Sequence, residues 1–196
     1  MLGLLLAVAE QSRTARRALE REDWDALLGG IARGDEAAFE AFYRASDKLI
    51  YAYALSLTRS HEDAQDVMME TYLSIRTGAG RYRSQGKPLA WVFTVAKNAA
   101  RSLQRAGARE ELMAEPPETA LPAWTADGSD DALALRAAME VLDEQERQIV
   151  VLHAVSGMKH RELAGLTGLP LSTVLSKYTR ALAKLRRALT EGEVTV

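Results

Sequence analysis

The chain has no cysteine among its 196 residues, and this absence excludes several classes of protein. A protein without thiols cannot be a disulfide-stabilised scaffold, an iron–sulfur protein, a thiolate zinc finger or a thiol enzyme. A long apolar run is also missing, because the apolar stretch over residues 1–9 is far shorter than the ~20 residues of a membrane-spanning helix. Arginines follow this stretch instead of preceding it, which does not fit a secretory signal. We expect a cytoplasmic protein with no cofactor and no metal.

A net excess of one charge is missing as well. The 25 basic and 27 acidic side chains leave a net charge of -2, which alone argues against a nucleic-acid-binding protein. The charges are unevenly placed: residues 76–109 contain eight basic and no acidic side chains, and residues 110–131 contain seven acidic and no basic ones. The flanking residues 1–75 sum to -5, and residues 132–196 sum to +2. The distribution predicts a basic surface followed by an acidic segment.

The acidic segment divides the chain into domains. It holds three of the five prolines, Pro116, Pro117 and Pro122, and proline fixes φ and removes a backbone donor. An acidic stretch that contains proline is typical of a solvated linker. We predict an N-terminal extension over residues 1–23, a first domain over 24–106, a linker over 107–131 and a second domain over 132–196.

Outside the linker, apolar side chains recur every three or four residues, which is the period of an amphipathic helix. Phe42, Leu49, Ile50 and Tyr53 form one such stripe. No run alternates with a period of two for long enough to form a strand. We therefore predict an all-α fold of two small helical domains, a helical bundle followed by a helix-turn-helix domain.

The second domain contains the helix-turn-helix pattern, over residues 160–177. Ala164 fits the close crossing of two short helices, and Gly168 fits a turn with left-handed backbone. Pro170 and Ser172 are typical of the start of a second helix, into whose angle Val174 packs back. This spacing predicts two helices joined by a tight turn.

The second helix of this pair has two different sides. Hydroxyl and cationic groups share one side, and apolar groups, Leu182 among them, share the other. Such a helix suits the major groove of duplex DNA, although a structural hairpin with a solvated basic face is the alternative. The candidate DNA-binding residues here are Thr173, Ser176, Lys177, Arg180 and Lys184.

The basic block combines its cations with aromatic side chains. On a helix that begins near Pro88, a polar and cationic stripe includes a tryptophan, which is unusual. Cations that follow phosphates, beside rings and an amide that hold unstacked bases, are typical of a site for single-stranded nucleic acid. The alternative is that Trp91 and Phe93 belong to the core and the arginines are merely solvated. The candidate DNA-binding residues are Tyr82, Arg83, Trp91, Asn98, Arg101 and Arg105.

An acidic face precedes this block. Asp63, Asp66 and Glu70 are spaced three and four residues apart, so their carboxylates share one side of a helix. Acid–base or metal chemistry is disfavoured, because no nucleophile or second ligand cluster accompanies these carboxylates. Two interpretations stay open from the residues alone, a docking surface for a protein partner and a solvated helix face.

Taken together, these segments resemble the extracytoplasmic-function (ECF) class of bacterial RNA polymerase sigma factors, from about Trp24 to Leu189. Residues 33–43 resemble the start of sigma region two, and residues 62–72 resemble the helix that docks on the clamp helices of the polymerase. Residues 88–98, with Arg101 and Arg105, resemble the segment that melts and reads the minus-ten promoter element. Residues 142–147 and 172–181 resemble region four, which reads the minus-thirty-five element.

The resemblance implies a function and partners. It implies a sigma factor that binds core RNA polymerase and promoter DNA, both duplex and melted, that is controlled by an anti-sigma factor and that is not an enzyme. It favours polymerase docking for the acidic face, with the residues Asp63, Asp66, Val67, Glu70 and Thr71. The chain departs from the family at Met69, where a polar Gln is usual, at Arg76, where Trp is frequent, and at Leu175, which replaces a basic residue.

Two other functions compete with this interpretation. One is a helix-turn-helix regulator that binds operator DNA without polymerase. The other is a sigma-like mimic that titrates an anti-sigma factor and never touches DNA; such a mimic is expected to have lost its cationic faces, and this chain keeps both. A helical enzyme ranks last, because no catalytic set of residues is present.

Overall fold

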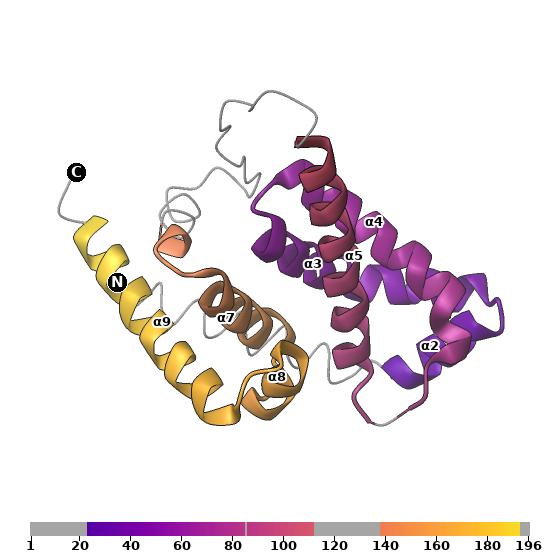
Figure 1. Cartoon of the computed structure of the whole chain (residues 1–196). Coiled ribbons are helices and arrows are strands. Elements are labelled where there is room, and N and C mark those ends of the chain that lie inside the picture. The colour runs from indigo at the N-terminus through magenta and orange to yellow at the C-terminus, as the bar shows by residue number, and fades with distance from the viewer. Residues whose placement is uncertain (1–22, 85, 112–137, 193–196) are drawn as a thin grey trace. The chain divides into compact units, whose positions relative to one another are not determined.

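The computed structural model describes residues 23–84, 86–111 and 138–192, and the long regular elements within these ranges are α-helices (Figure 1). The packing divides them into two compact units, one formed by the residues up to 111 and one formed by residues 138–192. The predicted all-α class with two helical domains is confirmed. The first unit contains α2 (Trp24–Ala32), α3 (Glu36–Thr58), α4 (His61–Gly78), the 3-10 turn η1 (Ala79–Arg81) and α5 (Pro88–Glu111). The second contains α7 (Glu144–Ser156), α8 (His160–Thr167) and α9 (Leu171–Gly192).

Side-chain caps set the helix boundaries of the first unit. Asp35 accepts hydrogen bonds from the backbone amides of Ala37 and Ala38 at the start of α3, and Ser60 accepts one from Asp63 at the start of α4. Arg59 ends α3 in the left-handed region, with φ of 61°. Because only Arg59 and Ser60 separate the two helices, α3 and α4 form a tight hairpin.

The core of the first unit lies where α3 packs on α2, α4 and α5. Its largest fully buried side chains include Tyr53 and Phe93, whose rings meet edge to face with centroids 5.2 Å apart. Where α2 crosses α3, a Cβ on Gly30 would lie 2.5 Å from the Cβ of Ala38, so this crossing requires glycine. The apolar stripes that predicted these helices are therefore the stripes that are buried.

The second unit packs α7 and α8 on α9. Gly168 ends α8 with φ of 75°, the left-handed backbone predicted for the turn. Val174, which was expected to pack into the angle between the two helices, is fully buried, as are Leu163 and Ile149. The helix-turn-helix prediction is confirmed, with α8 as its first helix and α9 as its second.

Several expectations lie outside the described residues. These are the extension over residues 1–22 and the linker beyond residue 111. Helix α5 continues to Glu111 and so includes the first residues of the predicted linker. Within the described ranges, no helix is long and apolar enough to span a membrane. The same ranges hold no group of three or more His, Asp or Glu side chains placed to bind a metal ion.

Candidate nucleic-acid and partner interfaces

The exposed side of α5 carries the predicted cations. Asn98, Arg101 and Arg105 are exposed, while Val92, Phe93 and Ala96 on the opposite side are buried. Arg105 donates from Nε to the carbonyl oxygen of Arg101 and from Nη2 to Ser102 Oγ, both at 3.2 Å. Neither arginine forms an ion pair with a carboxylate of the described residues. Their charges are therefore available to phosphate groups.

An aromatic pair lies at the start of the same helix. The rings of Tyr82 and Trp91 are tilted by 49°, with centroids 5.1 Å apart, and both residues are partly exposed. Tyr82 donates its hydroxyl to Asp25 Oδ1 at 2.6 Å, and burial, together with this carboxylate, raises the pKa of Tyr82 to about 12. Arg83 folds back and donates to the carbonyl oxygens of Gly80 and Tyr82. The hydroxyl of Tyr82 is thus held by Asp25, and both rings remain partly exposed to solvent.

The structure places the rings of Trp91 and Phe93, which the sequence analysis considered together, in different environments. Phe93 is in the core, 1% exposed, whereas Trp91 is not. The alternative in which both rings are core residues therefore holds for Phe93 alone. Of the predicted residues on this surface, Tyr82, Trp91, Asn98, Arg101 and Arg105 belong to the loop before α5 and to one side of α5.

The acidic face of α4 is narrower than predicted. Asp66 and Glu70 are exposed and Asp63 is partly exposed, but Val67 and Thr71 are buried, 1% and 0% exposed. Thr71 even satisfies its hydroxyl inside the helix, by donating to the carbonyl oxygen of Val67 at 2.6 Å. These two residues follow the stripe of α4 that faces the core, so their side chains are not exposed on the surface of the helix.

Two exposed apolar side chains lie beside these carboxylates: Met69, which the sequence analysis noted only as a departure from the family, and Leu73, which it missed. Met69 is 61% exposed and Leu73 is 53% exposed on α4. The exposure of Leu73 could have been predicted from the sequence, because Leu73 does not belong to the apolar stripe of Val67, Thr71 and Ile75 that is buried. We call Asp66, Met69, Glu70 and Leu73 the α4 face.

Arg76, at the end of α4, is held by α3. It forms an ion pair with Glu36, and its guanidinium carbon lies 5.4 Å from the centre of the Phe39 ring. A flat cation therefore covers an aromatic ring at a position where the family often has a tryptophan. Arg76 therefore links the end of α4 to the start of α3 at the surface of the unit.

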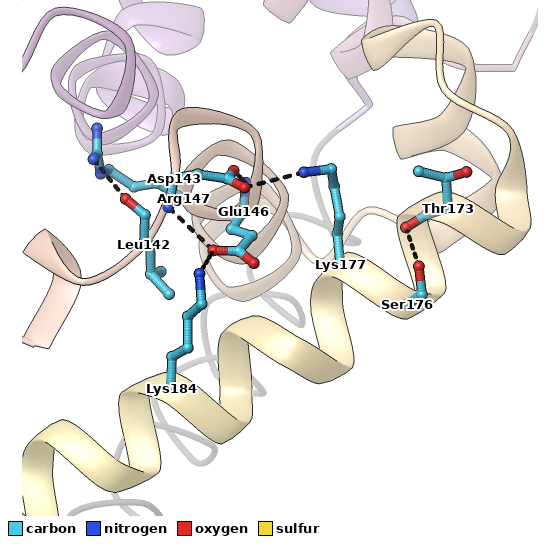
Figure 2. Close-up of polar contacts among 8 residues, drawn as sticks. All are labelled: Leu142, Asp143, Glu146, Arg147, Thr173, Ser176, Lys177 and Lys184. Atoms are coloured by element: carbon cyan, nitrogen blue, oxygen red, sulfur yellow. Dashed lines mark hydrogen bonds and ion pairs between the residues drawn. The ribbon is translucent and has the colours of Figure 1, made fainter.

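The cations of α9 divide into two groups. Figure 2 shows Lys177 directed at Asp143 and Lys184 directed at Glu146: Lys177 Nζ lies 3.1 Å from Asp143 Oδ2, and Lys184 Nζ lies 2.6 Å from Glu146 Oε2. Arg180, in contrast, is exposed and has no ion pair with a described carboxylate. The cations predicted to share one face therefore differ in their partners: the two lysines are paired with acids near the start of α7, and Arg180 is not.

Helix geometry explains this division. The buried stripe of α9 contains Val174 and Ala181, and Lys177 and Lys184 follow them by three residues, which places them beside the stripe and near α7. Leu182, assigned to the buried side, is instead 43% exposed. Among the other predicted residues, Thr173 is partly buried, and the exposed Ser176 donates from Oγ to the carbonyl oxygen of Thr173 at 3.0 Å.

The acids that hold the lysines form a capping box, which the sequence analysis did not assign. Asp143 accepts from the backbone amide of Glu146 at 2.7 Å, and Glu146 accepts from that of Asp143 at 3.1 Å. An Asp followed three residues later by Glu is a recognisable sign of a helix start. What the sequence does not show is that the same two carboxylates also meet α9.

Three aromatic rings join the helices of the second unit. His153 of α7 and His160 of α8 are stacked with centroids 4.7 Å apart, and each ring centre lies 4.8 Å from that of Tyr178 on α9. His153 donates from Nδ1 to the carbonyl oxygen of Met158 at 2.8 Å. Burial, and to a lesser degree the charge of His153, lowers the pKa of His160. The cluster therefore favours the neutral form of His160.

Two family models match the chain, sigma-70 region 2 over residues 42–110 and sigma-70 region 4 over residues 132–185. These matches define a protein of the sigma-70 type. RNA polymerase sigma factor CarQ of Myxococcus xanthus is 31% identical over 166 residues, 83% of this chain and 95% of that protein. ECF RNA polymerase sigma factor SigM of Mycobacterium tuberculosis is 30% identical over 172 residues, 87% of this chain and 86% of that protein. The chain belongs to the ECF sigma factors.

Solved structures are similar in fold. The sigma factor RpoE in complex with the anti-sigma factor NepR, from Bartonella quintana, has a TM-score of 0.63 at 23% identity over 77% of this chain and 98% of that chain. CnrH in complex with the cytosolic domain of CnrY has a TM-score of 0.60 at 25% identity over 87% of this chain and 99% of that chain.

Proposed function

We propose that the protein is a dissociable subunit of RNA polymerase that acts in the cytoplasm and directs promoter-specific initiation, without covalent chemistry of its own. The first unit binds core polymerase and holds the melted minus-ten element, and the second unit inserts α9 into the major groove at the minus-thirty-five element. The observation that carries this proposal is the exposed side of α5, on which Arg101 and Arg105 have no ion pair with a described carboxylate, together with the Tyr82–Trp91 pair at the start of the same helix.

Polymerase docking is assigned to the α4 face. Exposed apolar groups on Met69 and Leu73, bordered by the carboxylates of Asp66 and Glu70, have the composition of a protein interface with an apolar centre and a polar rim. Val67 and Thr71 support this face from the core. Their role in docking is to keep α4 in place, and the contact itself is made by their exposed neighbours.

Capture of the melted strand is assigned to α5 and the loop before it. A base stacked on an aromatic side chain contributes about 1–3 kcal/mol, and the Tyr82–Trp91 pair offers such a surface. Arg101 and Arg105 follow the phosphates, and the amide of Asn98 pairs with base edges. All of these residues are at least partly exposed, so a single DNA strand can contact them.

Duplex recognition is assigned to the first turns of α9. Ser176 and Arg180 are exposed where base edges and phosphates are reached in a helix-turn-helix complex. Leu175, which is 45% exposed, supplies an apolar contact that suits a thymine methyl group in place of the family's usual cation. This departure predicts a promoter with a thymine at the contacted position.

Control by an anti-sigma factor is the remaining part of the proposal. It is supported by the solved structure of a sigma factor in complex with an anti-sigma factor, whose fold is similar to that of this chain. The regulator is expected to cover the α4 face or α9, because occupying either one blocks initiation.

Transcription in vitro tests the proposal. Core polymerase, the protein and a genomic template library are expected to yield transcripts that begin at a defined set of promoters and that core polymerase alone does not make. A helix-turn-helix regulator predicts tight duplex binding without polymerase, and a mimic predicts no transcripts at all. Absence of any promoter-specific transcript across the library contradicts the proposal.

A further inference from the structure

We infer that Asp143 and Glu146 are positioning residues, which hold Lys177 and Lys184 against α7 so that these two lysines orient α9 and leave phosphate contact to its arginines. The inference rests on the proposed function, because it concerns the way in which α9 meets promoter DNA. It reassigns two of the five residues that the sequence marked as DNA-binding on this helix.

The first argument is the placement of the two ion pairs. The acids are three residues apart at the start of α7, and the lysines are seven residues apart, two turns, on α9. Each acid meets one lysine, as Figure 2 shows. Two separate contacts along a helix fix both its position and its direction, which a single contact cannot do. The pairs therefore define the angle at which α9 leaves the domain.

The second argument is the burial of the groups involved. The side chain of Glu146 is 0% exposed and that of Lys177 is 17% exposed. Glu146 Oε2 accepts from Lys184 and from the Asp143 backbone amide, while Glu146 Oε1 has no hydrogen-bond partner among the described residues. If Lys184 turned away to a phosphate, it would leave a buried carboxylate without its cation, which is strongly unfavourable. Lys184 is therefore retained by α7 when DNA binds.

The third argument is the state of Asp143. Burial alone raises the pKa of Asp143, but the Glu146 backbone amide and the ammonium groups of Lys177 and Lys184 outweigh burial and lower it. The carboxylate is thus ionised at neutral pH and available to Lys177. Its neighbour Arg147 donates from Nη2 to the carbonyl oxygen of Leu142 at 3.0 Å, which holds the segment that carries Asp143.

The exposed cations of α9 contrast with the two lysines. Arg180 and Arg187 are exposed, and no ion pair joins either to a carboxylate of the described residues. A phosphate can reach both arginines without breaking an internal contact. The salt dependence of DNA binding distinguishes the two groups of cations, because only cations that neutralise phosphates release counterions.

The experiment measures the slope of log K against log salt concentration for holoenzyme on a promoter fragment. Arg180→Gln is expected to reduce the slope by about 0.9, the value of one phosphate contact, whereas Lys177→Gln leaves it unchanged. Asp143→Asn keeps a good N-cap but removes the partner of Lys177, so the slope is expected to increase by about 0.9 and the preference for promoter over non-promoter DNA to fall. A loss of about 0.9 in Lys177→Gln, or an unchanged slope in Asp143→Asn, overturns the inference.

A second measurement does not depend on DNA. In thermal unfolding, Asp143→Asn and Lys177→Gln are expected to be less than additive when combined, because each removes the same ion pair. Additive effects contradict the pairing. If wild-type holoenzyme forms no promoter-specific complex, the proposed function fails, and the unfolding measurement still tests the ion pairs. Glu146→Gln is a poor first variant, since it disturbs the capping box as well.

Discussion

Helices α5 and α9 both carry cations at helical spacing, but the structure treats the two sets differently. On α5, Arg105 donates hydrogen bonds only within its own helix and Arg101 has no ion pair with a described carboxylate, whereas Lys177 and Lys184 on α9 are paired with acids of α7. On α5 the cationic side is opposite the buried side of the helix, whereas on α9 the two lysines lie next to the buried stripe. The comparison teaches that helical spacing alone does not decide whether a cation is left unpaired, because a neighbouring element can supply a carboxylate.

The aromatic clusters of the two units differ in the same way. The Tyr82–Trp91 pair is tied to Asp25 at one end and partly open to solvent, which suits a ligand-binding surface. The His153–His160–Tyr178 cluster instead links three helices to one another. We therefore expect changes in the first cluster to alter function and changes in the second to alter stability.

The largest expected effect is that of reversing the free cations on α5. Arg101→Glu combined with Arg105→Glu is expected to reduce promoter opening by at least about 100-fold, since each phosphate contact contributes about tenfold near 0.1 M salt. The effect is measured by run-off transcription on a duplex promoter and on the same promoter with a premelted minus-ten element. Lys48→Glu, at an exposed lysine of α3, is the matched control and retains activity. If the double variant loses less than about threefold, α5 does not contact the strand.

A smaller effect is expected from the aromatic pair. Trp91→Ala removes a stacking surface and is expected to weaken binding of a single-stranded minus-ten oligonucleotide by holoenzyme about tenfold. Tyr82→Phe keeps the ring but loses the hydrogen bond to Asp25, so a loss of about threefold is expected. Fluorescence anisotropy of a labelled oligonucleotide measures both. An equal loss in the two variants argues that the hydroxyl of Tyr82, and not stacking, is what matters.

The ring cluster of the second unit predicts a dependence of stability on pH. Because the pKa of His160 is lower in the folded chain, the unfolded chain takes up the proton first as pH falls below about 6.5. Stability of this unit is therefore full above pH 6.5 and falls as pH decreases towards 5, and a decrease of a few degrees in its melting temperature is expected. The groups that face His160 are His153 and Tyr178, with Arg161 and Glu162 beside it on α8.

Calorimetry of wild type and His160→Gln checks this expectation. The variant is expected to melt at nearly the same temperature at pH 5 and pH 7. The described part of the first unit contains no stacked histidine pair. The melting temperature of the first unit is therefore expected to change less between pH 5 and pH 7 than that of the second unit. If His160→Gln retains the full pH dependence, another group is responsible.

The helices, the two units and the turn at Gly168 could be predicted, because apolar period, caps and glycine are local properties of a sequence. The side of α9 on which Lys177 and Lys184 lie could not. It depends on where the buried stripe ends and on acids 34 and 38 residues earlier in the chain. Likewise, Val67 and Thr71 were assigned to the docking surface although they are buried. A family resemblance does not distinguish residues that contact a partner from residues that hold the helix in place.

The smallest expected effect concerns Met69 on the α4 face. Met69→Gln restores the residue that is usual in the family, and it is expected to weaken binding to core polymerase about twofold, because the exposed thioether side chain loses part of its apolar burial in the interface. Lys48→Gln, a similar change at an exposed position of α3, leaves binding unchanged. The affinity is measured by competition with a labelled wild-type protein. Tighter binding by Met69→Gln would mean that the carboxylates of Asp66 and Glu70 make the contact alone, and that the apolar surface between them serves a different partner.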